Sequence, residues 1–466
     1  MKKLPLLLAL VFATALLTAQ SPTQLTLLSR WDADTLPVAS PGGLNLQYNS
    51  VWGMAVNGRE IAVLGNARYV LFFDVTNPTQ PELIGKFAGS STTIWREFKS
   101  YKNRVYAVSD GTQEGLMIFD LSNAPQTITR SYWSNEFFRS SHSIMLDTVS
   151  GHIYLNGNSE ADMLVLDVSQ NPDKPTVWSK VTLTGGYIHD SYVRCDTLYA
   201  SSGYSGYYIY DFKTKPQAPK TLAAIETGGY NHNSWLTVDG RYAYYTEEIP
   251  RGRPIQIVDL KELSSTGDIE LVGSFLDEML TDTLPTAQAI PHNVYIRCDH
   301  LFNSQYEDGL LVYDLADPTN PVLKYWYDTH PENTQYNGYY GCWGNYPWLP
   351  SGNILASDMQ NGLFVFSSLG IDCQLPVPDC ATISSTPETD ETLRVGLSPN
   401  PTSDVFRVDL PGHSEWQFRL FSSAGNLLKT GPGTPEIKVA DLPDGIYFLE
   451  IQTTNGHRTT QRFVKN

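Results

Sequence analysis

A short sequence pattern recurs seven times between residues 69 and 368 and limits the folds open to this chain. Each copy is an apolar run that reads as a β-strand, and six copies end in Asp followed by an apolar residue. The first is YVLFFDV, and successive copies lie 44–55 residues apart. A repeat of this length that holds several strands is typical of a β-propeller blade. The repeated positions, which we expect to cap a turn, are Asp74, Asp120, Asp167, Asp211, Asp259, Asp314 and, with serine instead, Ser367.

Each repeat divides into four strands, as the sixth shows with PHNVYIR, HLFNSQ, GLLVYDL and PVLKYWYD. An outer strand follows each of the six aspartates, but none follows Ser367. The segment QLTLLSRWDAD, residues 24–34, resembles these outer strands and is expected to complete the last repeat, which would close the ring. We therefore predict an all-β chain with a seven-bladed β-propeller over residues 24–367.

The first 19 residues have the pattern of a secretory signal peptide. Lys2 and Lys3 precede an apolar run over residues 4–17, and Thr18-Ala19 supplies a small-residue cleavage site. No later run reaches the eighteen consecutive apolar residues typical of a membrane span, so we expect no transmembrane segment in the mature protein.

Two further segments follow the repeats. Residues 368–392 are acidic and rich in Pro, Ser and Thr, which indicates a linker. Residues 393–466 contain short alternating strands separated by turns such as Pro443-Asp444-Gly445. This pattern predicts a small immunoglobulin-like β-sandwich.

The five cysteines fit an exported protein, and none forms a C-x-x-C pair. Cys373 and Cys380 bracket the Pro-containing QLPVPD, which predicts a disulfide that closes a short loop. Cys195 and Cys298 occupy matching places in two repeats, in RCDTLY and RCDHLF, and are expected at turn or packing positions. Equivalent positions on non-adjacent blades are too far apart to bridge each other.

The end of the chain resembles the C-terminal sorting domain of the type IX secretion system. The resemblance rests on SPNP at 398–401, ADLPDGIYFLEI at 440–451 and the terminal RFVKN. It implies export across the outer membrane of a Bacteroidota-like bacterium, with the type IX machinery as a partner. The protein would then be extracellular or attached to the cell surface.

The repeats resemble the LVIVD-repeat propellers and, more closely, the choice-of-anchor B family of secreted proteins. The stretches that carry this resemblance are HNSWLTVDGRYAYYTEE, the repeat that begins at PHNVYIRCDHLF, and GCWGNYPWLPSGNILASDMQNGLFVF. The resemblance implies the propeller architecture and implies no particular reaction.

One polar position recurs at the start of the predicted inner strands. It is histidine in four repeats and Arg96-Glu97 in the second, while the first and last align less closely, at Ser50 and Gly344-Asn345. Because inner strands surround the central channel of a propeller, these side chains should meet near one mouth. The candidate ligand-binding residues are Arg96, Glu97, His142, His189, Asp190, His232, Asn233, His292 and Asn293.

Loops on the same face add carboxylates to these imidazoles, which makes a divalent cation a possible cofactor. Imidazole suits zinc, copper or iron and carboxylate suits calcium, so the metal stays open. The candidate metal ligands are the four histidines and Glu247. A second interpretation needs no ligand, because polar side chains at a fixed position can hydrogen-bond neighbouring blades. The loop carboxylates are Asp110, Glu160, Glu247, Glu248, Glu307, Asp308 and Asp358.

Composition and missing motifs narrow the function. A net charge of -17 excludes a nucleic-acid-binding surface as the default. The chain has no G-x-S-x-G elbow, phosphate-binding loop or H-E-x-x-H motif.

Our first hypothesis is a secreted or cell-surface binding or adhesion module with a ligand or cation site at the channel mouth. Its ligand would be a protein or a carbohydrate. The many Tyr and Trp residues between 336 and 348 could contact this ligand, or they could instead pack the last blade against the closing strand. The alternatives are a metal-dependent extracellular hydrolase or lyase that uses this mouth, and a purely structural surface protein.

Overall fold

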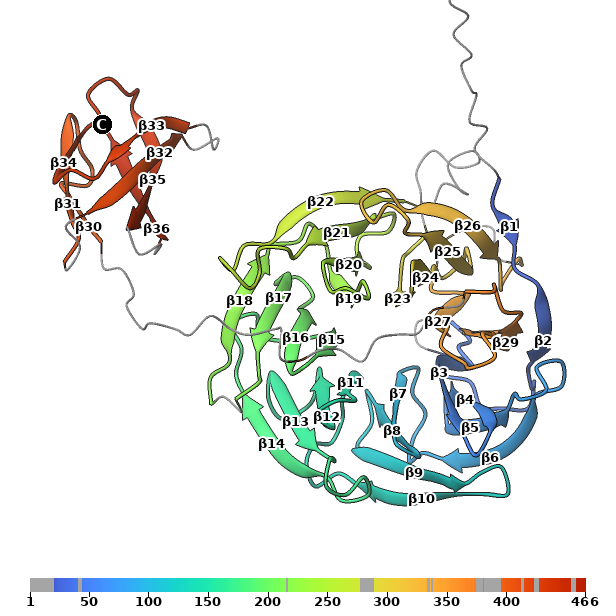
Figure 1. The fold of residues 1–466 in the computed structure, drawn as a ribbon. Helices are drawn as coiled ribbons and strands as arrows, with labels where there is room; N and C mark the ends of the chain where they lie inside the picture. Colours follow the sequence, from blue (N-terminus) through green and yellow to red (C-terminus); the bar gives the residue numbers. More distant parts are fainter. Residues whose placement is uncertain are drawn as a thin grey trace, which may run out of the picture. The chain divides into compact units, whose positions relative to one another are not determined.

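The computed structural model describes residues 21–40, 44–214, 217–276, 289–332, 336, 338–371, 373, 380, 395–411, 415–422, 427–453 and 458–466. All regular secondary structure in these ranges is β (Figure 1). None of the described residues forms a helix that could cross a membrane. The predicted signal peptide, residues 1–19, and most of the predicted linker, 368–392, lie outside the described residues.

The part of the chain up to Ser384 forms one compact unit built of antiparallel sheets arranged around a ring (Figure 1). We call each sheet a blade and number the blades along the chain. Blades 1 to 4 follow the sequence without interruption. Their strands are β3 (Tyr48–Val56), β4 (Arg59–Asn66), β5 (Tyr69–Asp74) and β6 (Glu82–Ala88); β7 (Arg96–Tyr101), β8 (Arg104–Ser109), β9 (Leu116–Asn123) and β10 (Thr127–Ser134); β11 (Ser143–Asp147), β12 (His152–Asn156), β13 (Met163–Asp167) and β14 (Thr176–Val181); and β15 (Asp190–Arg194), β16 (Thr197–Ser201), β17 (Tyr207–Asp211) and β18 (Lys220–Ile225).

Blades 5 and 6 repeat this order, and blade 7 draws its outer strand from the beginning of the described chain. The strand β2 (Leu27–Trp31) pairs antiparallel with β29, while β1 (Thr23–Gln24) adds a parallel fifth strand to blade 6. The all-β propeller predicted from the repeats is therefore confirmed. The remaining strands are β19 (Asn231–Leu236), β20 (Tyr242–Glu247), β21 (Ile255–Asp259) and β22 (Glu270–Phe275); β23 (Asn293–Arg297), β24 (His300–Ser304), β25 (Leu310–Asp314) and β26 (Val322–Tyr327); and β27 (Cys342–Tyr346), β28 (Ile354–Asp358) and β29 (Gly362–Phe366).

The burial of each strand follows from its place in the blade. The two middle strands are buried on both faces because neighbouring blades pack against them, as in β5, where Val70, Leu71 and Phe72 are fully buried. The outer strand β6, in contrast, is largely exposed. Inner strands lie around the centre in Figure 1, and each contacts the inner strand of the next blade, including β27 with β3.

The repeated aspartate caps a turn, as predicted. In blade 1, Asp74 Oδ1 accepts the backbone N–H of Thr76 at 2.9 Å, which fixes the chain as it leaves β5. The same bond to the residue two positions on, at 2.7–2.9 Å, recurs in the next five blades from Asp120, Asp167, Asp211, Asp259 and Asp314.

The predicted Cys373–Cys380 disulfide is wrong. Cys195 bonds to Cys380 and Cys298 bonds to Cys373, with Cα–Cα distances of 5.3 and 6.1 Å, while Cys342 is a buried free thiol. Cys195 and Cys298 do lie in turns, directly after the inner strands β15 and β23 and with φ of 52° and 58°. The disulfides therefore fasten the segment after blade 7 to blades 4 and 6, a connection that residue spacing could not reveal.

The C-terminal unit, from Ser385, contains two antiparallel sheets. Phe406 from one sheet packs with Leu420, Leu449 and Phe463 from the other in a shared apolar core. The first sheet has β30 (Gly396–Ser398), β31 (Val405–Asp409) and β34 (Glu436–Lys438), and the second has β33 (Leu427–Pro432), β32 (Trp416–Ser422), β35 (Gly445–Thr453) and β36 (Arg458–Lys465).

Candidate functional site

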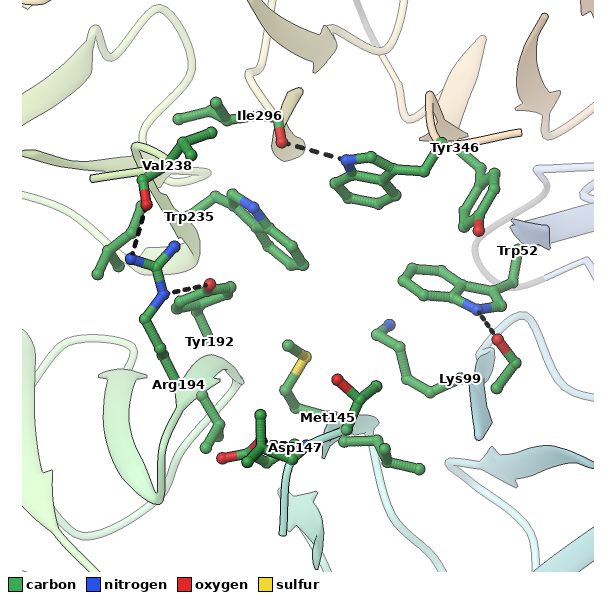
Figure 2. Close-up of a pocket in the computed structure, with 17 residues that line it drawn as sticks. Trp52, Lys99, Met145, Asp147, Tyr192, Arg194, Trp235, Val238, Ile296 and Tyr346 are labelled. Atoms are coloured by element: carbon green, nitrogen blue, oxygen red, sulfur yellow. Dashed lines mark hydrogen bonds between the residues drawn. The ribbon is translucent and has the colours of Figure 1, made fainter. Parts of the chain in front are cut away.

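The central channel of the propeller opens into one cavity at each end. Residues at or just before the start of the inner strands, together with loop residues, line a cavity of about 580 Å3, which we call the histidine mouth. Residues from the second half of the inner strands line the other, of about 310 Å3, which we call the aromatic mouth (Figure 2). The four predicted histidines, His142, His189, His232 and His292, all lie in the histidine mouth, where the ring model placed them.

The four imidazoles lie in a row around the channel, one on each of blades 3 to 6, and we call them the histidine row. Consecutive ring centroids are 4.2 Å apart at each of the three steps from His142 to His292. Three of the rings bind the next blade through Nδ1. His189 contacts the main-chain oxygen of His232 at 3.0 Å, His232 that of His292 at 3.0 Å, and His292 that of Trp343 at 2.5 Å. The same side chains therefore link neighbouring blades, as the second interpretation expects, and line a cavity.

These bonds determine the tautomer of each ring. A carbonyl oxygen only accepts hydrogen bonds, so Nδ1 of His189, His232 and His292 must carry the proton. Burial lowers the pKa of all three imidazoles, to about 3 for His292, and for His189 and His232 the neighbouring imidazoles lower it further. The rings are therefore neutral at neutral pH, and each Nε2 presents a lone pair.

His142 is the first ring of the histidine row, and its partner differs from those of the other three rings. Its Nδ1 lies 3.0 Å from Oδ2 of Asp110, which also lines the cavity. Burial would raise the pKa of Asp110, but the hydrogen bond and the charge interaction with His142 outweigh it and hold that pKa below its usual value. A carboxylate that orients an imidazole in this way is a common support for a metal-binding histidine.

A cluster of side chains that could hold a metal ion lies at the middle of the histidine row. Candidate ligand atoms of His189, His232 and Glu248 all lie within 4.8 Å of one another. Nε2 of His232 is 4.0 Å from Oε2 of Glu248, whose other oxygen accepts a 3.1 Å hydrogen bond from the Tyr306 hydroxyl. Burial raises the pKa of Glu248. Two imidazoles and one carboxylate are a common protein ligand set for zinc.

The carboxylate chosen from the sequence, Glu247, is not in the histidine mouth. It is the last residue of β20, and its Oε2 accepts a 2.7 Å bond from Arg253 inside blade 5. Glu248 follows directly and lines the cavity instead, because adjacent residues of an extended chain point to opposite sides. Of the seven loop carboxylates, Asp110 and Glu248 line the cavity.

Arg96 is also placed differently from the prediction. Its guanidinium is buried and forms two bonds to Glu114, at 2.6 and 3.1 Å, with further bonds to the main chain of Asn66 and Ser91. Arg96 therefore holds loops of blades 1 and 2 together, and does not line the histidine mouth.

The remaining candidates form a polar layer deeper in the channel. Asp190 accepts bonds from Ser143 and Asn233, at 2.9 and 2.8 Å, and so links blades 3, 4 and 5. Glu97 accepts bonds from Ser50 at 2.7 Å and from the Trp343 indole at 3.2 Å. The Asn233 side-chain oxygen accepts the N–H of Val294, and Asn293 is buried. These contacts support a structural role between the two mouths.

Some aromatic residues of the histidine mouth were expected from the sequence and others were not. Tyr339 and Trp343, which line the cavity, belong to the aromatic group noted between residues 336 and 348. Tyr187 and Tyr230 line the cavity and each precedes a histidine by two residues, in YIH and YNH. This spacing was a usable signal that was missed. Tyr306 and Trp343 pack against His292, with ring centroids 4.7 and 4.6 Å away. Trp343 takes the position in blade 7 that histidine holds in the preceding blades, because its main-chain oxygen accepts the hydrogen bond from His292 as that of His292 accepts the bond from His232.

Two family models match segments of the chain. A family model described as the secretion system C-terminal sorting domain matches residues 397–466, and the LVIVD repeat matches residues 303–329. No curated protein matches the chain. Among solved structures, the β-propeller domain of Cps50 (Swd1) from Myceliophteria thermophila is similar, with 14% identity, a TM-score of 0.48, and coverage of 74% of this chain and 99% of that domain.

The two family matches fit the two units of the structure. The LVIVD match covers the end of β24, all of β25 and β26, and the turns that join them, in blade 6. The sorting-domain match covers nearly all of the C-terminal unit and indicates handling by the type IX secretion machinery, with export to the cell surface or the extracellular space. The chain is therefore an LVIVD-repeat β-propeller that carries a C-terminal type IX sorting domain.

Proposed function

We propose that this protein is a binding or adhesion module displayed on the cell surface or released from it, and that its ligand site is the histidine mouth. The supporting observation is the set of four imidazoles at this mouth whose Nδ1 atoms are held by the next blade or by Asp110. Such an arrangement fixes each ring and leaves Nε2 available, which is how proteins orient histidine toward a metal ion.

We further propose that His189, His232 and Glu248 hold a divalent transition metal ion. Zinc–ligand bonds of about 2.0–2.1 Å place tetrahedral ligand atoms about 3.4 Å apart. The candidate atoms lie within 4.8 Å of one another, so the ion would draw them together by about 1 Å. It would also offset the charge of buried Glu248, and three protein ligands leave a position open for a donor from the bound molecule.

The rim of the mouth offers contact surface for that molecule. Tyr187, which lines the cavity, is 47% exposed, and Tyr204 is 71% exposed with its ring 5.0 Å from that of Tyr230. Rigid, partly exposed aromatic side chains around a pocket are frequent contact residues in protein and glycan recognition. A carboxylate or hydroxyl oxygen of a protein or glycan would complete the coordination of the ion.

The test compares the metal affinity of variants at two adjacent glutamates, Glu247 and Glu248. The full chain is stripped with a chelator, and Zn2+ and Co2+ binding is followed by calorimetry and by the visible spectrum of Co2+. We expect one ion per chain, and Glu248→Gln and His232→Gln should each weaken binding by at least tenfold. Glu247→Gln is the matched control, because this residue is adjacent but binds Arg253, and it should bind the metal as the unchanged chain does.

Two results would reject the metal site. The first is a folded, chelator-treated chain that binds neither ion. The second is equal loss of affinity in Glu247→Gln and Glu248→Gln, which would mean that the effect comes from general disruption of blade 5.

A further inference from the structure

The aromatic mouth has the features of a second binding site, independent of the metal site. Its walls include Trp52, Tyr192, Trp235 and Tyr346, which surround the opening in Figure 2. Trp52 packs edge-on against Tyr346 at 4.9 Å, and Trp235 lies 4.5 Å from Tyr192. A cavity of about 310 Å3 with such walls suits a small molecule with a flat, apolar body.

Most polar groups at this mouth have their own partners. Arg194 binds the Tyr192 hydroxyl and the main-chain oxygens of Thr237 and Val238, at 3.1–3.2 Å. Asp147 accepts the backbone N–H groups of Val149 and Asp196, at 2.9 and 2.8 Å. These groups shape the rim and have little capacity left for a ligand.

Lys99 is the exception. It is 6% exposed, and its side chain reaches into the pocket between Trp52 and Met145 (Figure 2). Its nitrogen lies 3.2 Å from the main-chain oxygen of Phe98 and 4.2 Å from the centroid of the Trp52 ring. An ammonium has three N–H donors, so within the described residues two of them have no acceptor.

The surroundings of Lys99 disfavour its charged form. Burial lowers the pKa of Lys99, although the charges of Glu97 and Asp190 oppose this effect. Both oxygens of Glu97 accept hydrogen bonds from other residues, Ser50 and Trp343, and burial raises the pKa of Glu97. A lysine held in an apolar pocket in its neutral form is a nucleophile.

We propose that Lys99 forms a reversible imine with a small aldehyde or ketone whose apolar body lies among the aromatic side chains of this mouth. The amine nitrogen attacks the carbonyl carbon, and one nitrogen proton passes to the carbonyl oxygen to give a carbinolamine. The hydroxyl takes up a proton from solvent and leaves as water while the nitrogen lone pair forms the C=N bond. Loss of the remaining nitrogen proton to solvent gives the neutral imine. The exchange consumes no oxidant or reductant.

The experiment traps the imine in the full, folded chain. The protein is incubated at pH 7 with benzaldehyde and sodium cyanoborohydride, and peptide mapping follows the benzylation of each lysine over time. Lys86 is the internal control, because it also lies 4.2 Å from an aromatic ring, that of Tyr69, but is exposed on the outer strand β6. We expect Lys99 to be modified at least about tenfold faster than Lys86, because the aromatic walls of the pocket hold the benzaldehyde ring next to the Lys99 amine.

Two comparisons distinguish a reactive site from a reactive surface. In denaturant the two lysines should be modified at the same rate, and in the folded chain glyoxylate, which is small and polar, should lose the preference for Lys99. Trp235→Ala should slow modification of Lys99 without affecting Lys86. Equal rates for the two lysines in the folded protein, or no modification of Lys99, would overturn the proposal without any variant.

Discussion

Nδ1 of His292 donates a hydrogen bond to the main-chain oxygen of Trp343 and so joins blade 6 to blade 7. Both residues are buried. This bond belongs to a series that runs from His189 through His232 to His292 and links four consecutive blades at the channel. The series joins neighbouring blades and fixes the orientation of the three rings.

Removal of this donor should destabilise the propeller. His292→Phe keeps an aromatic ring but leaves the Trp343 oxygen without its donor, and we expect a loss of about 1–3 kcal/mol in the free energy of unfolding at pH 7. Urea unfolding measures the change. His300→Phe, on a partly exposed histidine that contacts neighbouring Asp299, is the control and should lose less than His292→Phe.

Acidification should reduce this difference. The pKa of His292 is about 3 in the folded protein against 6.5 when unperturbed, so below pH 6.5 the unfolded chain binds a proton that the folded chain does not. The stability due to neutral His292 is therefore complete above pH 6.5 and is lost as pH falls toward 3, by about 3 kcal/mol at pH 4. The unfolding free energies of the unchanged chain and His292→Phe should converge near pH 5. A constant difference between pH 7 and pH 4 would contradict the assignment of a neutral buried ring.

The cysteine pairing can be tested by digestion without reduction. We expect peptides that join Cys195 to Cys380 and Cys298 to Cys373, and one free thiol, that of Cys342, in the denatured chain. Because each bond closes a long loop, Cys380→Ser should lower the stability of the propeller by about 2–5 kcal/mol. A peptide that joins Cys373 to Cys380 would restore the pairing predicted from the sequence.

Arg96 should matter for stability and not for ligand binding. Its pair with Glu114 is buried, so Arg96→Met leaves a buried carboxylate unpaired and should cost about 3–5 kcal/mol. Adding Glu114→Gln should recover part of this loss. Arg59→Met, which removes a pair with Asp74 in which the arginine side chain is 48% exposed, should change stability by less than about 1 kcal/mol. Metal affinity should stay unchanged in the folded variants.

Much of the propeller could be predicted because each blade repeats the same local structure, a capped turn after its third strand. The aspartate after the third strand is needed wherever the chain makes the same turn, so it recurs at a regular interval and reveals the blades. The four histidines recur for a related reason, since three of them contact the next blade in the same way.

What escaped prediction depends on contacts between segments far apart in the sequence. Cys195 and Cys380 are 185 residues apart, and no local pattern relates them. Glu248 lines the histidine mouth and Glu247 does not, and the end of β20, which decides which carboxylate faces the channel, is not visible from sequence. Arg96 aligned with the histidines, but its longer side chain reaches Glu114 inside its own blade.

The central claim is that His189, His232 and Glu248 bind a transition metal ion at the histidine mouth. The most direct measurement is a crystal structure of the full chain soaked with Zn2+, with an anomalous difference map calculated at the zinc edge. We expect one strong peak within about 2.0–2.2 Å of an imidazole nitrogen of each histidine and of an oxygen of Glu248. A map with no peak at this mouth, or a peak held by other residues, would contradict the account.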